Sequence, residues 1–179
     1  MRTQTTVQTI YKFSELSEKA KSVAIENERR YQSENMDPDL LIEVFTDALQ
    51  QKGLPVDDIR FSLNRCQGDG VAFYGILDII DFKSKNPDTI IPDDIEKIEI
   101  TKRSAFHMYD HENTMEVNAY SENDSDRFEK EFRTFLKDIS LELSQKGYEI
   151  LDYEQSESYI TQTIEANDME FLENGDQYY

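Results

Sequence analysis

The residues best suited to chemistry are one cysteine, two histidines and an aspartate that lies between two glycines. Cys66 is the only cysteine of the chain, and His107 and His111 are the only histidines. A histidine can activate a cysteine nucleophile, and Asp69 could join the histidines in the acid–base chemistry of a nuclease. The local sequence matches no cysteine-protease pattern, however, and a lone cysteine at a strand end is more often structural. An enzyme is therefore the less favoured interpretation.

The two histidines also have the i, i+4 spacing of a zinc-binding pair, with Asp110 and Glu112 as further candidate ligands. That spacing suits zinc on a helix. The residues around it alternate between apolar and polar types, which predicts strand and turn instead. A single cysteine also excludes a cysteine-based zinc cluster and an internal disulfide. We expect no metal and no cofactor.

Residues 67–70, Gln-Gly-Asp-Gly, could cradle a phosphate because glycine-rich turns expose backbone N–H groups. They lack the Lys-Ser/Thr ending of a P-loop, and Asp69 would repel phosphate. Apolar residues alternate on both sides of this stretch, at positions 59, 61 and 63 and again at 71, 73, 75, 77 and 79. This period predicts a β-hairpin whose turn takes positive φ angles at Gly68 and Gly70, with Gln67 and Asp69 exposed at its tip.

The other elements are predicted from periodicity and from residues typical of helix ends. Helices are expected over residues 14–31, 37–53, 124–147 and 156–168, with Ser14 or Ser17, Asp37, and Asp124 or Ser125 as N-caps. Gly53 and Gly147 are expected to end two of these helices. A second hairpin is expected over residues 95–122 with its turn at 110–113, and short strands over 5–13 and 148–154. A final strand with a turn at Asn174-Gly175 completes the chain.

Helices and hairpins in blocks, rather than in strict alternation, predict an α+β fold. We expect an antiparallel β-sheet, built from two hairpins plus edge strands, packed with two to four α-helices. The 179 residues suit a single acidic domain over residues 1–179. No signal peptide and no apolar run of about 20 residues is visible, so a cytoplasmic protein without membrane contact is expected.

The charge balance disfavours direct binding to nucleic acid and favours a basic partner. The chain has 38 acidic and 19 basic residues and a formal net charge of −19. No lysine or arginine occurs after Gly147. Carboxylates on one face of a strand would recur every ~6–7 Å and could imitate a nucleic-acid backbone, whereas the alternative is a solvated acidic surface. The acidic candidates of this tail are Asp152, Glu154, Glu157, Glu165, Asp168, Glu170 and Glu173.

Four stretches occur together in a familiar order. They read "YKFSELSEKAKSVAIENER", "FSLNRCQGDGVAFYG", "HMYDHENTMEV" and "ITQTIEANDMEFLENG". Taken together they resemble a group of small acidic proteins encoded by phages and mobile elements. Some similar proteins act as anti-CRISPR proteins against type II systems. The resemblance implies an inhibitor that binds the effector nuclease or its guide-RNA complex, and it makes no residue catalytic.

The resemblance suggests where such a partner would bind. If both hairpins share one sheet, Gln67 and Asp69 of the first turn would lie near Tyr109 and His111 of the second, and the two tips would form one surface. Glu122, Asp124 and Asp126, together with the acidic tail, would supply negative charge. Two alternatives stay open: an enzyme that disables the guide RNA through His107, His111 and Asp69, and an antagonist of another defence system such as restriction.

Overall fold

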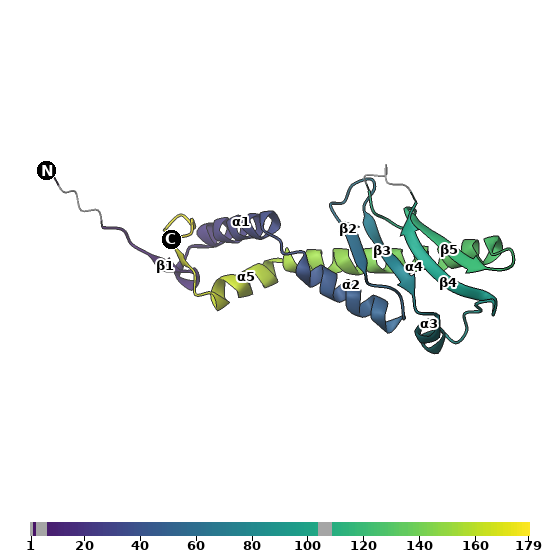
Figure 1. Ribbon diagram of the computed structural model, residues 1–179. Helices are drawn as coiled ribbons and strands as arrows, with labels where there is room; N and C mark the ends of the chain where they lie inside the picture. The colour runs from purple at the N-terminus through teal and green to yellow at the C-terminus, as the bar shows by residue number, and fades with distance from the viewer. Residues whose placement is uncertain (1, 3–6, 104–108) are drawn as a thin grey trace. The chain divides into compact units, whose positions relative to one another are not determined.

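The computed structural model describes residues 2, 7–103 and 109–179 of the chain. The chain divides into two compact units, which are described separately (Figure 1). The first, Met1–Asp37 with Ile150–Tyr179, is called the terminal unit; the second, Pro38–Glu149, is called the sheet unit. The predicted α+β class is confirmed, because five α-helices within the described residues accompany antiparallel sheets of four and two strands. The expected single domain stays a prediction.

The sheet unit contains both predicted hairpins in one antiparallel sheet of order β2-β3-β4-β5. Its register pairs Phe61 with Val71, and Ile100 with both Gly75 and Val117. The alternation seen in the sequence sets this register, because a slip by one residue would turn every apolar side chain to the other face. The strands are β2 (Asp58–Ser62), β3 (Gly70–Leu77), β4 (Ile95–Lys102) and β5 (Met115–Ser121).

Helices α2 (Asp39–Gln51) and α4 (Asp126–Glu154) form the core with this sheet, and α4 crosses one face of it in Figure 1. Phe45 of α2 packs edge-on against Phe61, with ring centroids 5.5 Å apart. The start of α2 is one residue later than predicted, and Pro38 precedes it with helical angles. The expected stop at Gly53 is confirmed, since this residue has φ +66°.

Gly147 does not end α4, and residues 148–154 form no strand. Both predictions were wrong, because α4 continues through Gly147 to Glu154. A Cβ atom at position 147 would lie 2.5 Å from Leu63 Cδ1 and 3.0 Å from the Phe45 ring. The glycine is therefore required for close packing of the helix against the sheet and α2, and not for a left-handed turn.

A short helix, α3 (Ile79–Lys85), was not predicted. The sequence interpretation assigned Ile79 to the preceding strand and expected no helix over the residues that follow it. In the structure the Asp78 side chain accepts hydrogen bonds from the N–H groups of Ile80 and Asp81, both at 3.0 Å. This N-cap ends β3 and starts the helix. The helix buries Phe82, whose ring lies edge-on to that of Phe132 with centroids 5.4 Å apart.

The terminal unit packs its helices around a small core that includes Ala20, Ala24, Ile160, Ile164 and Phe171. Ser17, one of the two predicted candidates, caps α1, and Ser156 caps α5, for which no cap was predicted. Gly175 has φ +91° and confirms the final turn. The elements are β1 (Tyr11–Lys12), η1 (Phe13–Glu15), α1 (Glu18–Glu34), α5 (Glu157–Ala166) and β6 (Glu170–Phe171).

Two further observations complete the fold. The predicted first strand is limited to β1 among the described residues before η1. No helix in the described part of the chain is both long and apolar enough to cross a membrane.

Candidate functional site

The turns of the two hairpins meet in the sheet unit, as the sequence interpretation proposed. A Cβ atom on Gly68 would lie 2.9 Å from ring atoms of Tyr109, and one on Gly70 would lie 2.5 Å from the Cβ of His111. Only glycines allow the first turn to approach the second so closely. We call residues 65–69 and 109–113 together the two-turn surface.

Asp69 is a hydrogen-bond hub of this surface rather than an exposed tip. The half-buried carboxylate accepts hydrogen bonds from Tyr148 Oη at 2.7 Å and from Ser62 Oγ at 2.9 Å. The Cys66 backbone N–H and thiol also donate to it, at 3.0 and 3.2 Å. Burial opposes ionisation, but these donors outweigh it and lower the pKa of Asp69 to about 2. Asp69 therefore holds the turn together.

Cys66 is exposed, but its thiol is unsuited to nucleophilic attack. The hydrogen bond to the Asp69 carboxylate raises the pKa of the thiol. Partial desolvation of the thiol and the charge of Asp69 raise this pKa further. A thiolate beside this carboxylate would be repelled, whereas catalytic cysteines need a positive environment that lowers their pKa. The arrangement favours the structural interpretation of this residue.

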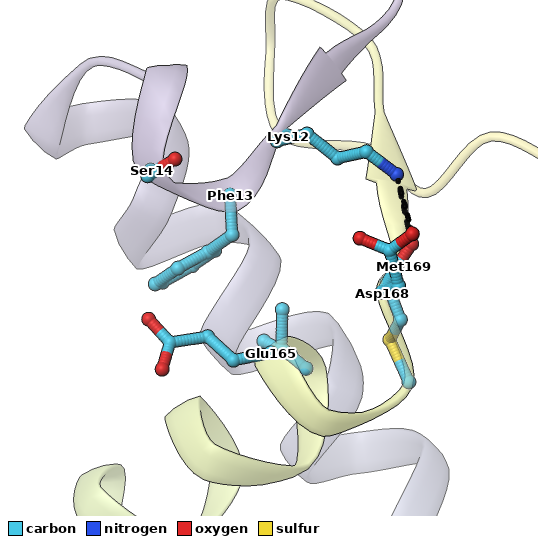
Figure 2. A pocket seen from close by; sticks show the side chains of 7 residues that line it. Lys12, Phe13, Ser14, Glu165, Asp168 and Met169 are labelled. Atoms are coloured by element: carbon cyan, nitrogen blue, oxygen red, sulfur yellow. Dashed lines mark hydrogen bonds and ion pairs between the residues drawn. The ribbon is translucent and has the colours of Figure 1, made fainter.

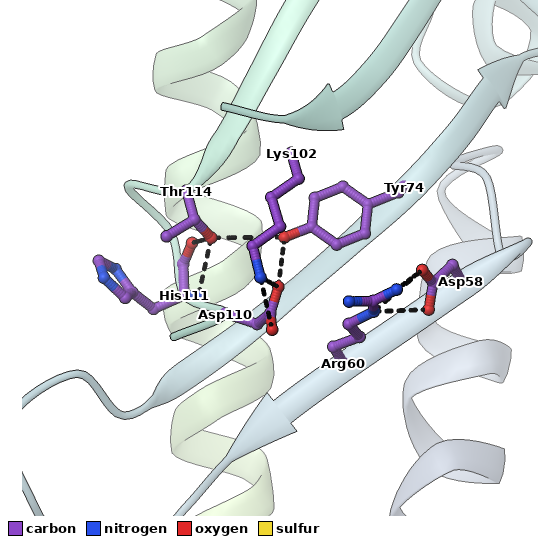
Figure 3. A network of polar contacts seen from close by, with 7 residues as sticks. All are labelled: Asp58, Arg60, Tyr74, Lys102, Asp110, His111 and Thr114. Carbon is purple, nitrogen blue, oxygen red and sulfur yellow. Dashed lines mark hydrogen bonds and ion pairs between the residues drawn. The ribbon is translucent and has the colours of Figure 1, made fainter. Parts of the chain in front are cut away.

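A second polar network lies on the other turn (Figure 3). Tyr74 Oη donates to Asp110 at 2.7 Å, and Lys102 Nζ forms an ion pair with the same carboxylate at 2.9 Å. Burial raises the pKa of Tyr74, and the hydrogen bond to Asp110 acts in the same direction. His111 N–H donates to Thr114 Oγ1 at 3.0 Å. These contacts anchor the second turn to β3 and β4.

The His111 ring points away from this network in Figure 3. Its Nδ1 accepts a hydrogen bond from the Asn113 N–H at 3.2 Å, and Glu112 Oε2 lies 3.4 Å from the same nitrogen. His107, together with the predicted core positions 106 and 108, lies outside the described residues. Among the residues described, no group of three or more His, Cys, Asp or Glu side chains is placed to hold a metal ion.

The acidic candidates lie at the surface of both units. Glu122, Asp124 and Asp126 are exposed around the start of α4 in the sheet unit. In the terminal unit Glu154 is half-buried, while the exposed candidates are Asp152, Glu157, Glu165, Asp168, Glu170 and Glu173. Most of this tail is helical, which corrects the expectation of a strand-spaced row of carboxylates. Helical residues face one direction only every three or four positions.

One pocket of the terminal unit already contains its own cation (Figure 2). The cavity of about 300 Å³ is lined by residues that include Lys12, Phe13 and Glu165. Lys12 Nζ lies 3.0 Å from Asp168 and 3.1 Å from Glu170, and the hydrogen bonds to these two acids raise its pKa. The ion pairs neutralise part of the charge that the tail would otherwise present.

Sequence reasoning missed Tyr148, Tyr74 and Lys102, which fix the two turns. Tyr148 was assigned to a strand. Tyr148 lies four residues after the buried Ser144, so both side chains share the helix face that packs on the sheet. This could have been predicted if the helix had been extended through Gly147.

The two-turn surface presents Gln67, Tyr109 and Asn113 as exposed side chains on a braced backbone. Amide groups and an aromatic ring on a rigid support suit the recognition of another macromolecule. Comparison with protein-family models, with curated proteins and with solved structures found no match to this chain.

Proposed function

We propose that this protein is a non-enzymatic inhibitor that binds a basic, nucleic-acid-binding surface of a bacterial defence nuclease. The target proposed is a type II CRISPR effector, following the resemblance of the motifs to phage-encoded proteins. The observation that carries the proposal is the set of exposed acidic residues in the segment Ile150–Tyr179 of the terminal unit. This segment contains no lysine or arginine. Such a surface attracts a positively charged groove and repels phosphate.

Charge pairing inside the protein supports this assignment. Many basic side chains lie within ion-pair distance of an acid on their own surface, including Lys52 with Glu142 at 3.3 Å and Arg127 with Glu131 at 2.9 Å. Since acidic residues outnumber basic ones two to one, pairing leaves an excess of exposed carboxylates. RNA-guided nucleases hold the guide–target duplex in a positively charged channel, which is a matching partner.

The contacts of Asp69 and Cys66 argue for binding rather than catalysis. Asp69 is occupied by internal donors, and the pKa of the Cys66 thiol is raised. Asp69 is therefore poorly suited to accept a proton from a substrate, and Cys66 is poorly suited to act as a nucleophile. The two-turn surface would then contribute specificity through its exposed amides and ring, while the acidic surface would accelerate association.

The test is a titration of the purified protein against a type II effector, guide-free and guide-loaded, with DNA cleavage and guide integrity followed in the same samples. Loss of cleavage near one inhibitor per effector, with intact guide, is the expected result. Cleaved guide at far lower ratios would replace this proposal with the enzyme alternative. Absence of any effect on several effectors would direct the search to other defence nucleases, such as restriction enzymes.

Salt supplies a second test of the same proposal. Attraction between exposed charges is screened over about 8–10 Å at physiological ionic strength. Inhibition should therefore weaken steeply as sodium chloride is added. Inhibition that does not change with salt would contradict an electrostatic interface.

A further inference from the structure

Glu28 of α1 is a buried residue whose carboxylate forms no ion pair within the described residues. The residue is only 7% exposed. The one hydrogen bond that it accepts within the described residues comes from Gln32 Nε2 to Oε1, at 3.0 Å. Its other carboxylate oxygen is not sealed from solvent, so it can accept a hydrogen bond from a ligand.

This carboxylate lines a cavity of about 340 Å³ in the terminal unit. We call this cavity the Glu28 pocket. Its wall also includes Tyr31, Glu34, Asp176 and Tyr179. Tyr31 is 57% exposed and Tyr179 is 93% exposed, so neither ring is committed to the core. The pocket thus combines three carboxylates with two available aromatic rings.

The C-terminal turn is fixed against α1, which gives the pocket a defined shape. A Cβ atom at Gly175 would lie 2.2 Å from the Ala20 carbonyl oxygen, so only glycine permits this approach. Asn27 Nδ2 on α1 donates to Asp176 Oδ1 at 3.3 Å, and Asn174 Nδ2 donates to Asp176 Oδ2 at 2.8 Å. These contacts bring Asp176 to the side of the helix that carries Glu28.

Arg30 also lines the pocket, and its single charge balances only one of the three carboxylates. Its guanidinium donates to Asn27 Oδ1 at 3.2 Å, and within the described ranges no acid lies at ion-pair distance from it. The pocket of Lys12 provides the contrast, since that lysine contacts two carboxylates directly.

We infer that the Glu28 pocket binds an arginine side chain of the protein partner. A planar guanidinium can bond a carboxylate through two N–H groups and stack on a tyrosine ring, which matches both features of the pocket better than the compact ammonium of lysine. The inference rests on the proposed function for the identity of the partner. In this inference the Glu28 pocket recognises one arginine side chain specifically. The acidic surface as a whole attracts the basic partner without such specificity.

The experiment titrates the full chain with Nα-acetyl-arginine methylamide at constant ionic strength and follows the backbone amides by NMR. The expected result is a set of shifts confined to residues 27–34 and 176–179 and to the Gln32 side chain. The citrulline analogue, which is neutral and of the same shape, should produce none. Equal shifts from the lysine derivative would overturn the assignment to arginine.

Variants locate the site. Glu28→Gln should weaken binding of the arginine probe by about tenfold or more, because it removes the charge that bonds the guanidinium. Tyr31→Leu should also weaken it, and this exposed position provides a second variant that leaves the core unchanged. Glu43→Gln, an equal charge change on the exposed face of α2, should have no effect. Unchanged binding in Glu28→Gln, or shifts spread over the acidic surface, would overturn the inference.

Nuclease assays separate this inference from the proposed function. Probe binding at Glu28 without inhibition of any nuclease would contradict the proposed function and leave the pocket in place. Equal inhibition by the wild type and by Glu28→Gln would leave the proposed function in place and overturn the role of the pocket in recognition.

Discussion

Asp69 in the sheet unit and Glu28 in the terminal unit are both shielded carboxylates, but the chain treats them differently. Asp69 accepts four hydrogen bonds, from Tyr148, Ser62 and two groups of Cys66. Glu28 accepts one from the described part of the chain, donated by Gln32. A saturated carboxylate organises its own loop, whereas an unsaturated one remains available to a ligand. In a protein with many acidic residues, the number of internal hydrogen-bond donors therefore distinguishes a carboxylate that stabilises the fold from one that is available to bind a partner.

The largest effect is expected from Asp69→Ala. This substitution removes the acceptor of four donors, two of which come from Cys66 itself. It should lower the free energy of unfolding by roughly 2–3 kcal/mol, as measured by urea denaturation. Asp88→Ala, at an exposed loop position, is the matched control. A loss no larger than that of the control would show that Asp69 is not structural.

Glu28→Gln is expected to change the free energy of unfolding in the opposite direction. The amide keeps the size of the side chain and removes one of three carboxylates that line the same cavity, so less repulsion should raise the free energy of unfolding by up to about 1 kcal/mol. Glu43→Gln should change it by less than about 0.5 kcal/mol. If Glu28→Gln were destabilised as strongly as Asp69→Ala, the contrast between the two acids would be removed.

The low pKa of Asp69 should make the free energy of unfolding depend on pH in the acidic range. Its pKa is about 2 in the folded protein and ~3.9 in an unfolded chain. Because the folded value is the lower one, the contribution of the carboxylate is complete above about pH 4 and is lost as the pH falls through about 2. The stability difference between the wild type and Asp69→Asn should narrow across that window. A difference that stays constant there would contradict the low pKa.

The direct check of this pKa is a titration of the Asp69 carboxyl carbon by NMR. A midpoint near 4 would show that its donors do not favour the charged form in solution.

The smallest effect is expected at Cys66. Because its thiol pKa is raised by Asp69, alkylation by iodoacetamide near pH 8 should be slower than that of a free cysteine peptide. Asp69→Asn should accelerate the reaction, and Asp88→Asn should not. Mass spectrometry gives the rates. Rapid alkylation of the wild-type protein would reopen the nucleophile interpretation.

Local sequence patterns account for much of the secondary structure. The period-two alternation around residues 67–70 predicted the first hairpin, and Ser17, one of two candidate caps, marked the start of α1. Gly53 ended α2 as expected, because a helix stop of this kind is set by the positive φ of the residue itself. Gly147 was misread because its role depends on Leu63 and Phe45, which are remote in sequence.

The candidate site was predicted only in outline. The sequence indicated that the turns around Asp69 and His111 would meet if the hairpins shared a sheet. It could not identify Tyr148 as the partner of Asp69, because that hydrogen bond joins residues 79 positions apart. The Glu28 pocket was missed entirely, since Glu28 is one acid among 38 until burial distinguishes it.

By itself, the sequence determined the net charge of −19, the two hairpins and most helix ends, because composition and short-range periodicity are local properties. The tertiary structure decided which glycines permit close packing, which carboxylates accept many hydrogen bonds and which of them line a pocket with an excess of negative charge. Those outcomes depend on atoms brought together from distant parts of the chain. Hydrogen bonding and burial are properties of that assembled neighbourhood, and no single stretch of residues specifies them.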